Sequence, residues 1–318
     1  MINILILTEG GPSIGFGHIT RCLSLYEAFE DVDANIKMLV NGPDSVSPLL
    51  NGANHKLCDW HDKKIKDNDI IVIDSYVTDR KFYDQLAKKC KLLVCYDDYQ
   101  RIDYPDGSVV ANCVIGAEKL KYQNENNHYL LGGDFASVRA EIADSDPIQI
   151  KYVIENVLIT VGGMDFSPFL IKLLSDLAKV FPHLDYHVVV PQQTFFQKKR
   201  MLHVYPRLDI DAYINLIHKC DICISGGGQT TYELANLGIP TISVCLADNQ
   251  ISNLQGWQES GFIEYAGKHD DVDINEKIIA AMKKMTSHRS RYRKSQLGQE
   301  MIDGKGAKRI CQHILSLL

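Results

Sequence analysis

The segment "CDICISGGGQTTYELANLGIPTISV", residues 220–244, joins a short apolar run to a helical pattern and then to a second apolar run. Three glycines follow the first run, and Gly238 with Pro240 marks the end of the helical pattern. Parallel strands need a crossover connection, which is usually a helix. The order strand, glycine-rich turn, helix, strand therefore predicts a parallel, Rossmann-like α/β fold.

The same alternation extends along the whole chain in two series, which predicts two Rossmann-like lobes with parallel sheets. In the first series we expect strands at 3–8, 34–40, 69–74, 92–96 and 109–113, with helices at 18–29, 48–51 and 79–88. In the second series we expect strands at 156–161, 186–190, 222–225 and 241–244, with helices at 168–180, 209–218 and 230–237.

A polar stretch with one proline, "AEIADSDPIQIKYVIEN" at 140–156, separates the two series and is interpreted as a linker. We place an N-terminal lobe at 1–145 and a C-terminal lobe at 146–318. The tail, 274–318, is a set of helices broken at "DGKGA", and its last part could return to the first lobe. The sheets are expected to face a central cleft, because open parallel sheets bind ligands at the carboxyl ends of their strands.

Composition narrows the class of protein. The chain has 318 residues, a formal charge of −6 and nine cysteines. No block of like charges indicates nucleic-acid binding, and no apolar run indicates stable membrane insertion. The first strand lacks the basic flank of a signal peptide. Cys220 and Cys223 lie in a predicted buried strand, which favours reduced thiols over a zinc site. We expect a cytoplasmic protein that is a monomer or a weak oligomer.

The glycine-rich turn at 226–228 is the strongest candidate for a phosphate site, because N–H groups at a helix start suit a diphosphate. No Gly-Lys-Ser/Thr follows, so this is not a P-loop. Glu233 could accept hydrogen bonds from a ribose, or it could form a capping box with Thr230. The candidate nucleotide-binding residues are Gly226, Gly227, Gly228, Thr230, Thr231 and Glu233.

A second candidate is "SIGFGHITRCLSL", residues 13–25, where the first strand leads into a helix. Gly15 and Gly17 permit a tight turn, and His18 falls at the helix start. Thr20 stands where a dinucleotide fingerprint requires its third glycine, so NAD binding is disfavoured. His18 could be an ordinary helix-start residue, a phosphate contact or a general base. The helix dipole disfavours the charged imidazolium, and a neutral imidazole can accept a proton.

Further polar residues follow the ends of other predicted strands. Asp97 and Asp98 follow one another in sequence, so their side chains should point in opposite ways, which favours one structural and one ligand-facing carboxylate over a metal site. Asn249 and Gln250 could orient a water or bind sugar hydroxyls, or they could simply cap a turn. The other candidate substrate-binding residues are Gly15, Gly17, Asp74, Tyr76, Gly162, Gly163 and Gln250.

Taken together, these pieces resemble the PseG-type nucleotide-sugar hydrolases, relatives of the MurG-like GT-B glycosyltransferases. The matching segments are "IGFGHITRCLSL", "VIDSY", "YDD", "FASVRAEI", "VGGMD", "ISGGGQTTYELANLGIPTI", "DNQ" and "DGKGAKRI", in that order along nearly the whole chain.

The resemblance implies a GT-B-like fold and hydrolysis of UDP-2,4-diacetamido-2,4,6-trideoxy-β-L-altropyranose. That reaction cleaves the anomeric C–O bond with inversion and without a metal or cofactor, and it releases UDP and the free sugar for pseudaminic acid synthesis. The family's water-activating base corresponds to His18, and its catalytic asparagine to Asn249. Its nucleotide contacts correspond to Thr230, Thr231 and Glu233. The alternative is a GT-B glycosyltransferase that uses the same kind of UDP-sugar donor.

The chemistry of the leaving group agrees with a single base. Ordinary inverting glycosidases need two carboxylates, because a sugar alkoxide leaves poorly. A nucleoside diphosphate leaves more readily when hydrogen-bond donors stabilise its growing charge. No obvious carboxylate pair or metal-binding D-x-D triad is therefore required.

Overall fold

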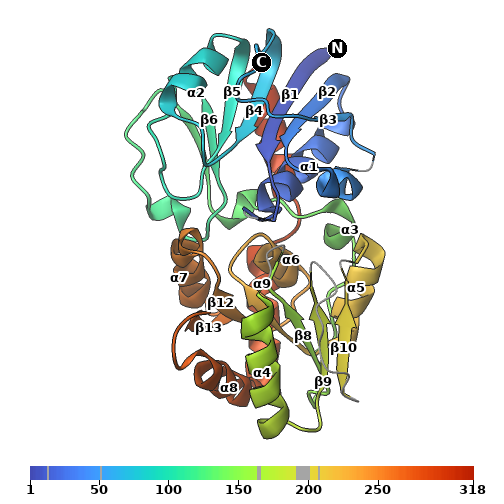
Figure 1. Ribbon diagram of the computed structural model, residues 1–318. Coiled ribbons are helices and arrows are strands. Elements are labelled where there is room, and N and C mark those ends of the chain that lie inside the picture. The colour runs from blue at the N-terminus through green and yellow to red at the C-terminus, as the bar shows by residue number, and fades with distance from the viewer. Residues whose placement is uncertain (13, 51, 163–165, 191–200, 207) are drawn as a thin grey trace. The chain divides into compact units, whose positions relative to one another are not determined.

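The computed structural model describes residues 1–318 except 13, 51, 163–165, 191–200 and 207. It divides the chain into two compact units. The N-terminal unit comprises Met1–Ala140 and Gly304–Leu318, and the C-terminal unit comprises Glu141–Asp303 (Figure 1). The division falls after residue 140 rather than 145, and it assigns the last fifteen residues to the N-terminal unit.

The N-terminal unit is built on a parallel sheet of seven strands in the order β3-β2-β1-β4-β5-β6-β7. The order reverses between β1 and β4, which makes their carboxyl ends the expected ligand site of this unit. The strands are β1 Ile2–Glu9, β2 Ala34–Asn41, β3 His55–Leu57, β4 Asn68–Asp74, β5 Cys90–Tyr96, β6 Val109–Asn112 and β7 His128–Leu131.

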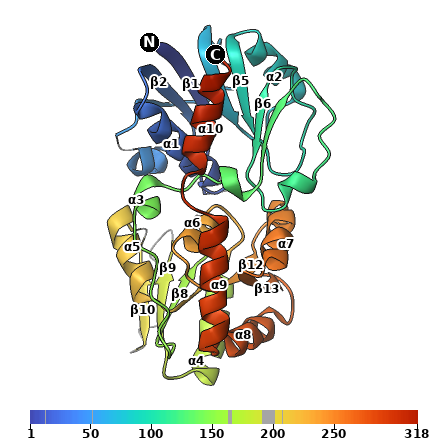
Figure 2. The same cartoon turned by 180° about the vertical axis from the view of Figure 1, so that it is seen from behind.

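Helices cover both faces of this sheet. On one face, α1 (Gly17–Glu30) lies beside α10 (Gly306–Ser316), as Figure 2 shows, and the Cys311 thiol donates to the carbonyl of Ala28 at 3.4 Å. On the other face, α2 (Arg80–Ala87) places its buried Tyr83 and Leu86 in a cluster with Trp60 and the strand residues Ile71 and Leu93. The described 3₁₀ turns of this unit are η1 Asp44–Leu50, η2 Ala117–Lys119 and η3 Gly133–Phe135, and the short helix α3 Ala140–Ala143 crosses the boundary into the C-terminal unit.

The C-terminal unit repeats this plan with six parallel strands in the order β10-β9-β8-β11-β12-β13. Its order reverses between β8 and β11. The strands are β8 Asn156–Thr160, β9 Asp185–Val189, β10 Leu202–Tyr205, β11 Ile222–Gly226, β12 Thr241–Cys245 and β13 Ile263–Lys268. The prediction of two Rossmann-like α/β units is confirmed.

In the C-terminal unit, α4 (Ser167–Val180) and α8 (Ile274–Met285) pack on one face of the sheet and α6 (Thr230–Asn236) and α9 (His288–Met301) on the other (Figures 1 and 2). The remaining helices are α5 Ile210–Lys219, η4 Asp248–Gln250 and α7 Ile251–Ser260.

The stretch interpreted as a linker is attached to the C-terminal unit rather than free. The N–H of Ile148 donates to the carbonyl of Leu237 at 2.9 Å. The buried guanidinium of Arg291 donates to the carbonyls of Lys151 and Tyr152, both at 2.8 Å. Arg291 lies on α9, so these hydrogen bonds fix the stretch against that helix.

The helix expected at 48–51 is different in the structure: it is a 3₁₀ segment, Asp44–Leu50, with Pro48 inside it. Proline cannot donate the hydrogen bond that an α-helix interior needs, so the tighter turn is the form available.

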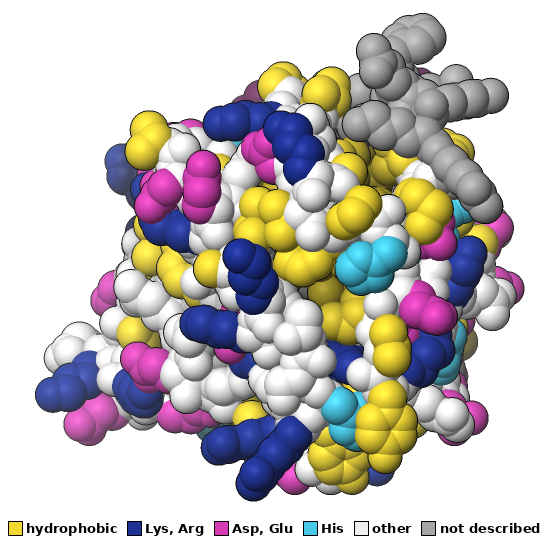
Figure 3. All heavy atoms as spheres, turned by 90° about the horizontal axis from the view of Figure 1, so that it is seen from below, with side chains coloured by type: hydrophobic (Ala, Val, Ile, Leu, Met, Phe, Trp, Pro, Cys, Tyr) yellow, Lys and Arg dark blue, Asp and Glu magenta, His cyan; other side chains and the backbone are white. Residues whose placement is uncertain are grey.

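The face drawn in Figure 3 carries basic and acidic side chains interspersed among scattered hydrophobic ones. Within the described residues, no helix is long and apolar enough to cross a membrane.

One buried histidine makes the C-terminal unit sensitive to acid. His187 on β9 is fully buried, with Nε2 3.0 Å from the Asn156 side-chain oxygen and Nδ1 3.0 Å from the Tyr205 hydroxyl. Its ring stacks on that of His203 with 4.6 Å between centroids. Burial, with nearby Lys219 and His203, lowers the pKa of His187 to about 4.

We predict that the C-terminal unit loses stability as the pH falls from about 6.5 to 4. The unfolded chain binds a proton at His187 in this window and the folded chain does not, so protonation favours unfolding. With a folded pKa of about 4, the full difference amounts to at most roughly 3 kcal/mol. His187→Gln should unfold with a shallower pH dependence in thermal melts at pH 7.5 and 5. Equal slopes for the two proteins would contradict the prediction.

Candidate functional site

A short turn connects β1 to α1 and sets the position of His18. The backbones of Gly11 and Gly15 exchange two hydrogen bonds, at 2.9 and 2.8 Å. Gly15 has a φ of +80°, which a residue with a side chain rarely adopts. Helix α1 then begins at Gly17, which makes His18 its second residue. The tight turn expected of the two glycines therefore depends on Gly15, while Gly17 is already helical.

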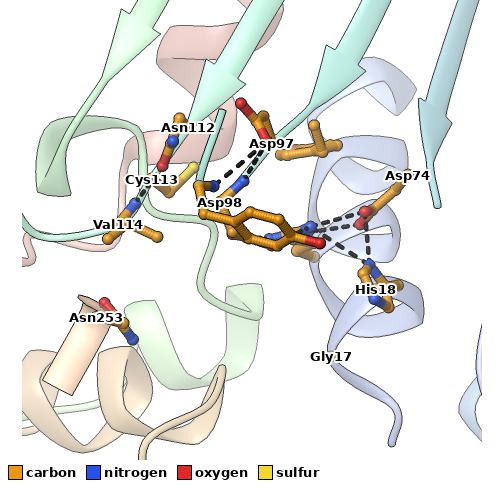
Figure 4. A network of polar contacts seen from close by, with 12 residues as sticks. Gly17, His18, Asp74, Asp97, Asp98, Asn112, Cys113, Val114 and Asn253 are labelled. Atoms are coloured by element: carbon orange, nitrogen blue, oxygen red, sulfur yellow. Dashed lines mark hydrogen bonds and ion pairs between the residues drawn. The ribbon is translucent and has the colours of Figure 1, made fainter. Parts of the chain in front are cut away.

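His18 is held by the last residue of the neighbouring strand β4. Its Nδ1 lies 2.6 Å from Oδ1 of Asp74, and both residues are buried (Figure 4). Asp74 pairs in register with Thr8 on β1, so the two groups meet where the strand order reverses. Among the described residues, the other ring nitrogen, Nε2, has no hydrogen-bond partner.

Arg21, one turn further along α1, ties this pair to the next strand. Its Nε and Nη2 donate to the two carboxylate oxygens of Asp74 at 2.5 and 2.7 Å. Its Nη1 and Nη2 also donate to the two oxygens of Asp98, beyond the end of β5, at 2.8 and 3.1 Å. The guanidinium lies over the ring of Tyr96, 4.9 Å from the centroid. One cation thus bridges two carboxylates.

Tyr76 lies in the segment after β4 and completes a cluster with His18, Arg21, Asp74 and Asp98. Its ring meets the His18 ring edge-on, with 4.3 Å between centroids, and its hydroxyl donates to Oδ2 of Asp98. Burial, together with Asp98, raises the pKa of Tyr76 well above its usual value, so the phenol stays neutral. Asp97 has a structural role, since it accepts the N–H groups of Asp98, Tyr99 and Arg101 and the Tyr122 hydroxyl.

The charges of the cluster assign the histidine tautomer. Burial opposes ionisation of Asp74 and Asp98, but the guanidinium of Arg21 outweighs it and holds the pKa of both carboxyls below the usual range. An ionised Asp74 can only accept, so Nδ1 of His18 carries the proton that it donates. Nε2 of a neutral His18 is then an open proton acceptor. Two carboxylates and one guanidinium leave these three side chains with one surplus negative charge.

In the C-terminal unit, the glycine-rich turn packs tightly on the unit's own side chains. A Cβ on Gly226 would lie 2.5 Å from Leu246, and one on Gly227 would lie 2.4 Å from Leu254. A Cβ on Gly228 would meet only Gln250, at 3.6 Å. The first two glycines are therefore required by internal packing, and Gly228 alone leaves room for a ligand.

Some hydrogen-bond donors of this turn have acceptors within the unit and others do not. The Thr231 hydroxyl donates to the carbonyl of Gly226 at 3.0 Å, and the N–H of Gly227 donates to the side-chain oxygen of Gln250 at 3.2 Å. In the described part of the chain, the backbone N–H groups of Gly228 and Thr230 have no acceptor. These two donors remain for an anion.

The helix start differs from the capping box expected at Thr230. The N-cap residue is Gln229, which makes no side-chain capping bond, and Thr230 is the first helical residue. Gln229 adopts the right-handed helical conformation, so the helix starts one residue earlier than a threonine cap would set it. Glu233 is buried, at 3% exposure.

The segment after β12 contains Gln250 and Asn253, which hydrogen-bond to the glycine-rich turn, and the exposed Asn249. The oxygen of the Gln250 side chain also accepts the N–H of Leu246 at 3.0 Å, so it joins two turns. Asn249 is exposed. Asn253, which the sequence analysis did not single out, is buried, donates to the carbonyl of Gly227 at 3.0 Å and accepts from the Tyr232 hydroxyl at 2.8 Å. Its place three residues after Gln250, the N-cap of α7 (Ile251–Ser260), is the signal that marks it.

The structure brings together His18, Asp74, Tyr76 and Asp98 of the residues named from the sequence, and it adds Arg21. In the C-terminal unit, Gly162 follows β8 with a φ of +79°, and Gly163 lies outside the described residues. Within the described ranges, no group of three His, Cys, Asp or Glu side chains could hold a metal ion.

The comparisons with known proteins agree with the resemblance seen in the sequence. No family model matches the chain. The chain is 26% identical to the Helicobacter pylori protein "Pseudaminic acid cytidylyltransferase and UDP-2,4-diacetamido-2,4,6-trideoxy-beta-L-altropyranose hydrolase", over 82% of this chain. The chain spans about half of that relative, 48% of its length.

Solved structures show the fold. The S. aureus MnaA–UDP co-structure matches with a TM-score of 0.71 and 12% identity, covering 100% of this chain and 98% of that one. MurG of Acinetobacter baumannii matches with a TM-score of 0.63 and 12% identity, over 99% and 100%. The predicted likeness to a PseG-type hydrolase and to MurG-like GT-B proteins is thereby confirmed.

We predict that Arg21→Met destabilises the N-terminal unit by about 3–5 kcal/mol, because it leaves two buried carboxylates without their cation. Arg80→Met is the matched control, since Arg80 is 39% exposed in its ion pairs with Asp84 and Asp103. It should cost only about 0–1 kcal/mol. Denaturant unfolding measures both, and a similar small loss for the two variants would contradict the prediction.

We predict that Gly227→Ala costs about 1–3 kcal/mol through overpacking against Leu254. Gly228→Ala, at the open position, should leave the free energy of unfolding nearly unchanged. The double variant Gly227→Ala with Leu254→Ala should lose less than the sum of the two single losses, because the clash is shared. Additive losses would show that Leu254 is not what excludes a side chain at residue 227.

Proposed function

We propose that this chain hydrolyses a UDP-sugar at its anomeric carbon, with His18 as the base that activates water. The observation that carries the proposal is the buried pairing of His18 Nδ1 with Asp74 at 2.6 Å, which leaves Nε2 as the proton acceptor. The named hydrolase of Helicobacter pylori, 26% identical, supports the choice of reaction and of a UDP-2,4-diacetamido-2,4,6-trideoxy sugar as substrate.

In the proposed reaction, a water on Nε2 loses its proton to His18 as its oxygen attacks the anomeric carbon. The bond from that carbon to the diphosphate oxygen breaks, and the electron pair leaves with UDP. The imidazolium that forms stays hydrogen-bonded through Nδ1 to the carboxylate of Asp74, which holds the ring in place during the transfer. Attack opposite the leaving group inverts the anomeric centre.

The diphosphate is proposed to bind at the glycine-rich turn of the C-terminal unit. The N–H groups of Gly228 and Thr230 are the donors that the unit does not use itself. They would stabilise the charge that grows on the leaving phosphate. Thr231, Gln250 and Asn253 then act indirectly, by holding the turn in shape. Direct roles for Asn249 and Glu233 stay predictions from the resemblance, and one for Gly162 stays a prediction from the glycines that follow its strand.

Hydrolysis can be followed by NMR with the UDP-sugar in ¹⁸O-labelled water. We expect UDP and free sugar, with the label on the sugar and inversion at its anomeric carbon, and the same rate in the presence of EDTA. Label on UDP would contradict C–O cleavage. UDP binding without turnover would indicate a binding protein, and turnover only with an added acceptor would favour the glycosyltransferase alternative.

We predict that His18→Gln and Asp74→Asn each lower kcat by about 10²–10⁴-fold, the usual contribution of a general base. The second variant keeps the side-chain shape and removes the charge that fixes the tautomer. Both should still bind UDP in calorimetry, because the proposed diphosphate donors lie in the other unit. Full activity of His18→Gln would overturn the mechanism.

A further inference from the structure

Glu9, the last residue of β1, is a buried carboxylate that the proposed reaction does not use. It is 3% exposed. Because Thr8 is the register partner of Asp74, and successive strand residues point to opposite faces, Glu9 lies on the face away from the Asp74 carboxylate. There its Oε1 accepts the backbone N–H of Tyr76 at 2.9 Å.

The other carboxylate oxygen faces His61. Nε2 of His61 lies 3.6 Å from Oε2 of Glu9, and Nδ1 lies 2.8 Å from Asp59. The His61 ring stacks on Trp60, with 4.0 Å between centroids, and the indole N–H of Trp60 donates to the carbonyl of Thr8 at 2.7 Å. Glu9 therefore lies between the backbone N–H of Tyr76, to which it is hydrogen-bonded, and the ring of His61, which packs on a tryptophan anchored to strand β1.

Tyr76 needs such an anchor, because it lies in the irregular segment between β4 and α2. Its backbone N–H has Glu9 as its acceptor, and a buried N–H without an acceptor costs about 1–3 kcal/mol. Its side chain reaches in the other direction, to the His18 ring and the Asp98 carboxylate. The position of the ring over His18 thus depends on where the backbone of residue 76 is held.

We propose that Glu9 is a positioning residue of the His18 centre: by accepting the Tyr76 N–H, it holds the Tyr76 ring against His18 and the Tyr76 hydroxyl on Asp98. Strand β1 then sets the positions of both His18 and Tyr76. Its end leads through the glycine turn to His18, and its last side chain fixes Tyr76. The effect on turnover rests on the proposed hydrolysis, whereas the effect on the His18 ring does not.

The test compares Glu9→Met, which has a similar length and no charge, with Glu9→Gln, whose amide oxygen can still accept the N–H. Glu9→Met should lower kcat by about 10–100-fold with KM within threefold, the scale of a small misplacement of reacting groups. Glu9→Gln should restore most of that loss. A rise in KM at unchanged kcat would overturn the proposal, since it would place Glu9 on the substrate.

The matched control is Asp221→Asn, a buried carboxylate of the C-terminal unit that accepts the N–H groups of Glu155 and Asn156, both at 2.8 Å. It should lower the melting temperature and leave kcat unchanged. The proposal fails if Glu9→Met behaves in the same way. If Glu9 acts by positioning Tyr76, Glu9→Met should cause no further loss of kcat in a Tyr76→Ala background. The proposal also fails if Glu9→Met lowers kcat there by the same factor as in the native protein.

A readout without substrate separates this inference from the proposed function. The ring protons of His18, assigned by their loss in His18→Gln, feel the ring current of Tyr76 at 4.3 Å. Glu9→Met should shift these NMR resonances, and Asp221→Asn should not. If the native protein fails to hydrolyse the UDP-sugar, the proposed function fails, and these resonances still decide the role of Glu9. Unchanged resonances in Glu9→Met would overturn it.

Discussion

The bidentate contact of Arg21 with Asp74 is the constraint on which the N-terminal site depends. It fastens helix α1 to the end of strand β4 where neither carboxylate nor guanidinium has much access to water. A buried charge pair of this kind adds little net stability relative to apolar residues, but losing one partner is costly. The pair therefore fixes geometry more than it stabilises the fold, and the geometry it fixes is the hydrogen bond from His18 to Asp74.

The candidate sites of the two units rest on different kinds of contact, although both lie on parallel sheets. In the N-terminal unit, the first strand is followed by a helix with two charged partners, which suits proton transfer. In the C-terminal unit, the turn after β11 is held by neutral contacts from Gln250, Asn253 and Leu254. Among the described residues, the backbone N–H groups of Gly228 and Thr230 in this turn have no acceptor, and such donors suit an anion. Both sites lie at carboxyl strand ends, as the parallel sheets require.

The sequence predicted the central strands and missed the edges. β3, β7, β10 and β13, which it did not identify, are the edge strands of the two sheets. Central parallel strands are buried on both faces and form continuous apolar runs, whereas an edge strand such as "HKL" or "LHVY" has no such run. Likewise, His18 and Asp74 were recognised from their places at strand ends. Arg21 was not, because a helical arginine carries no sign of the carboxylates that the fold brings to it.

The glycine-rich turn shows that consecutive glycines can have different roles, some in packing and one in binding. From the sequence alone, Gly226, Gly227 and Gly228 are equally good candidates for a phosphate contact. In the structure, a Cβ at Gly226 would lie 2.5 Å from Leu246 and one at Gly227 would lie 2.4 Å from Leu254, so internal packing already favours glycine at these two positions. Of these three glycines, only Gly228 has room for a side chain, so packing within the unit does not explain its identity. An anion site at this turn should therefore be sought at Gly228 and the next backbone donor, Thr230, and not across the whole glycine run.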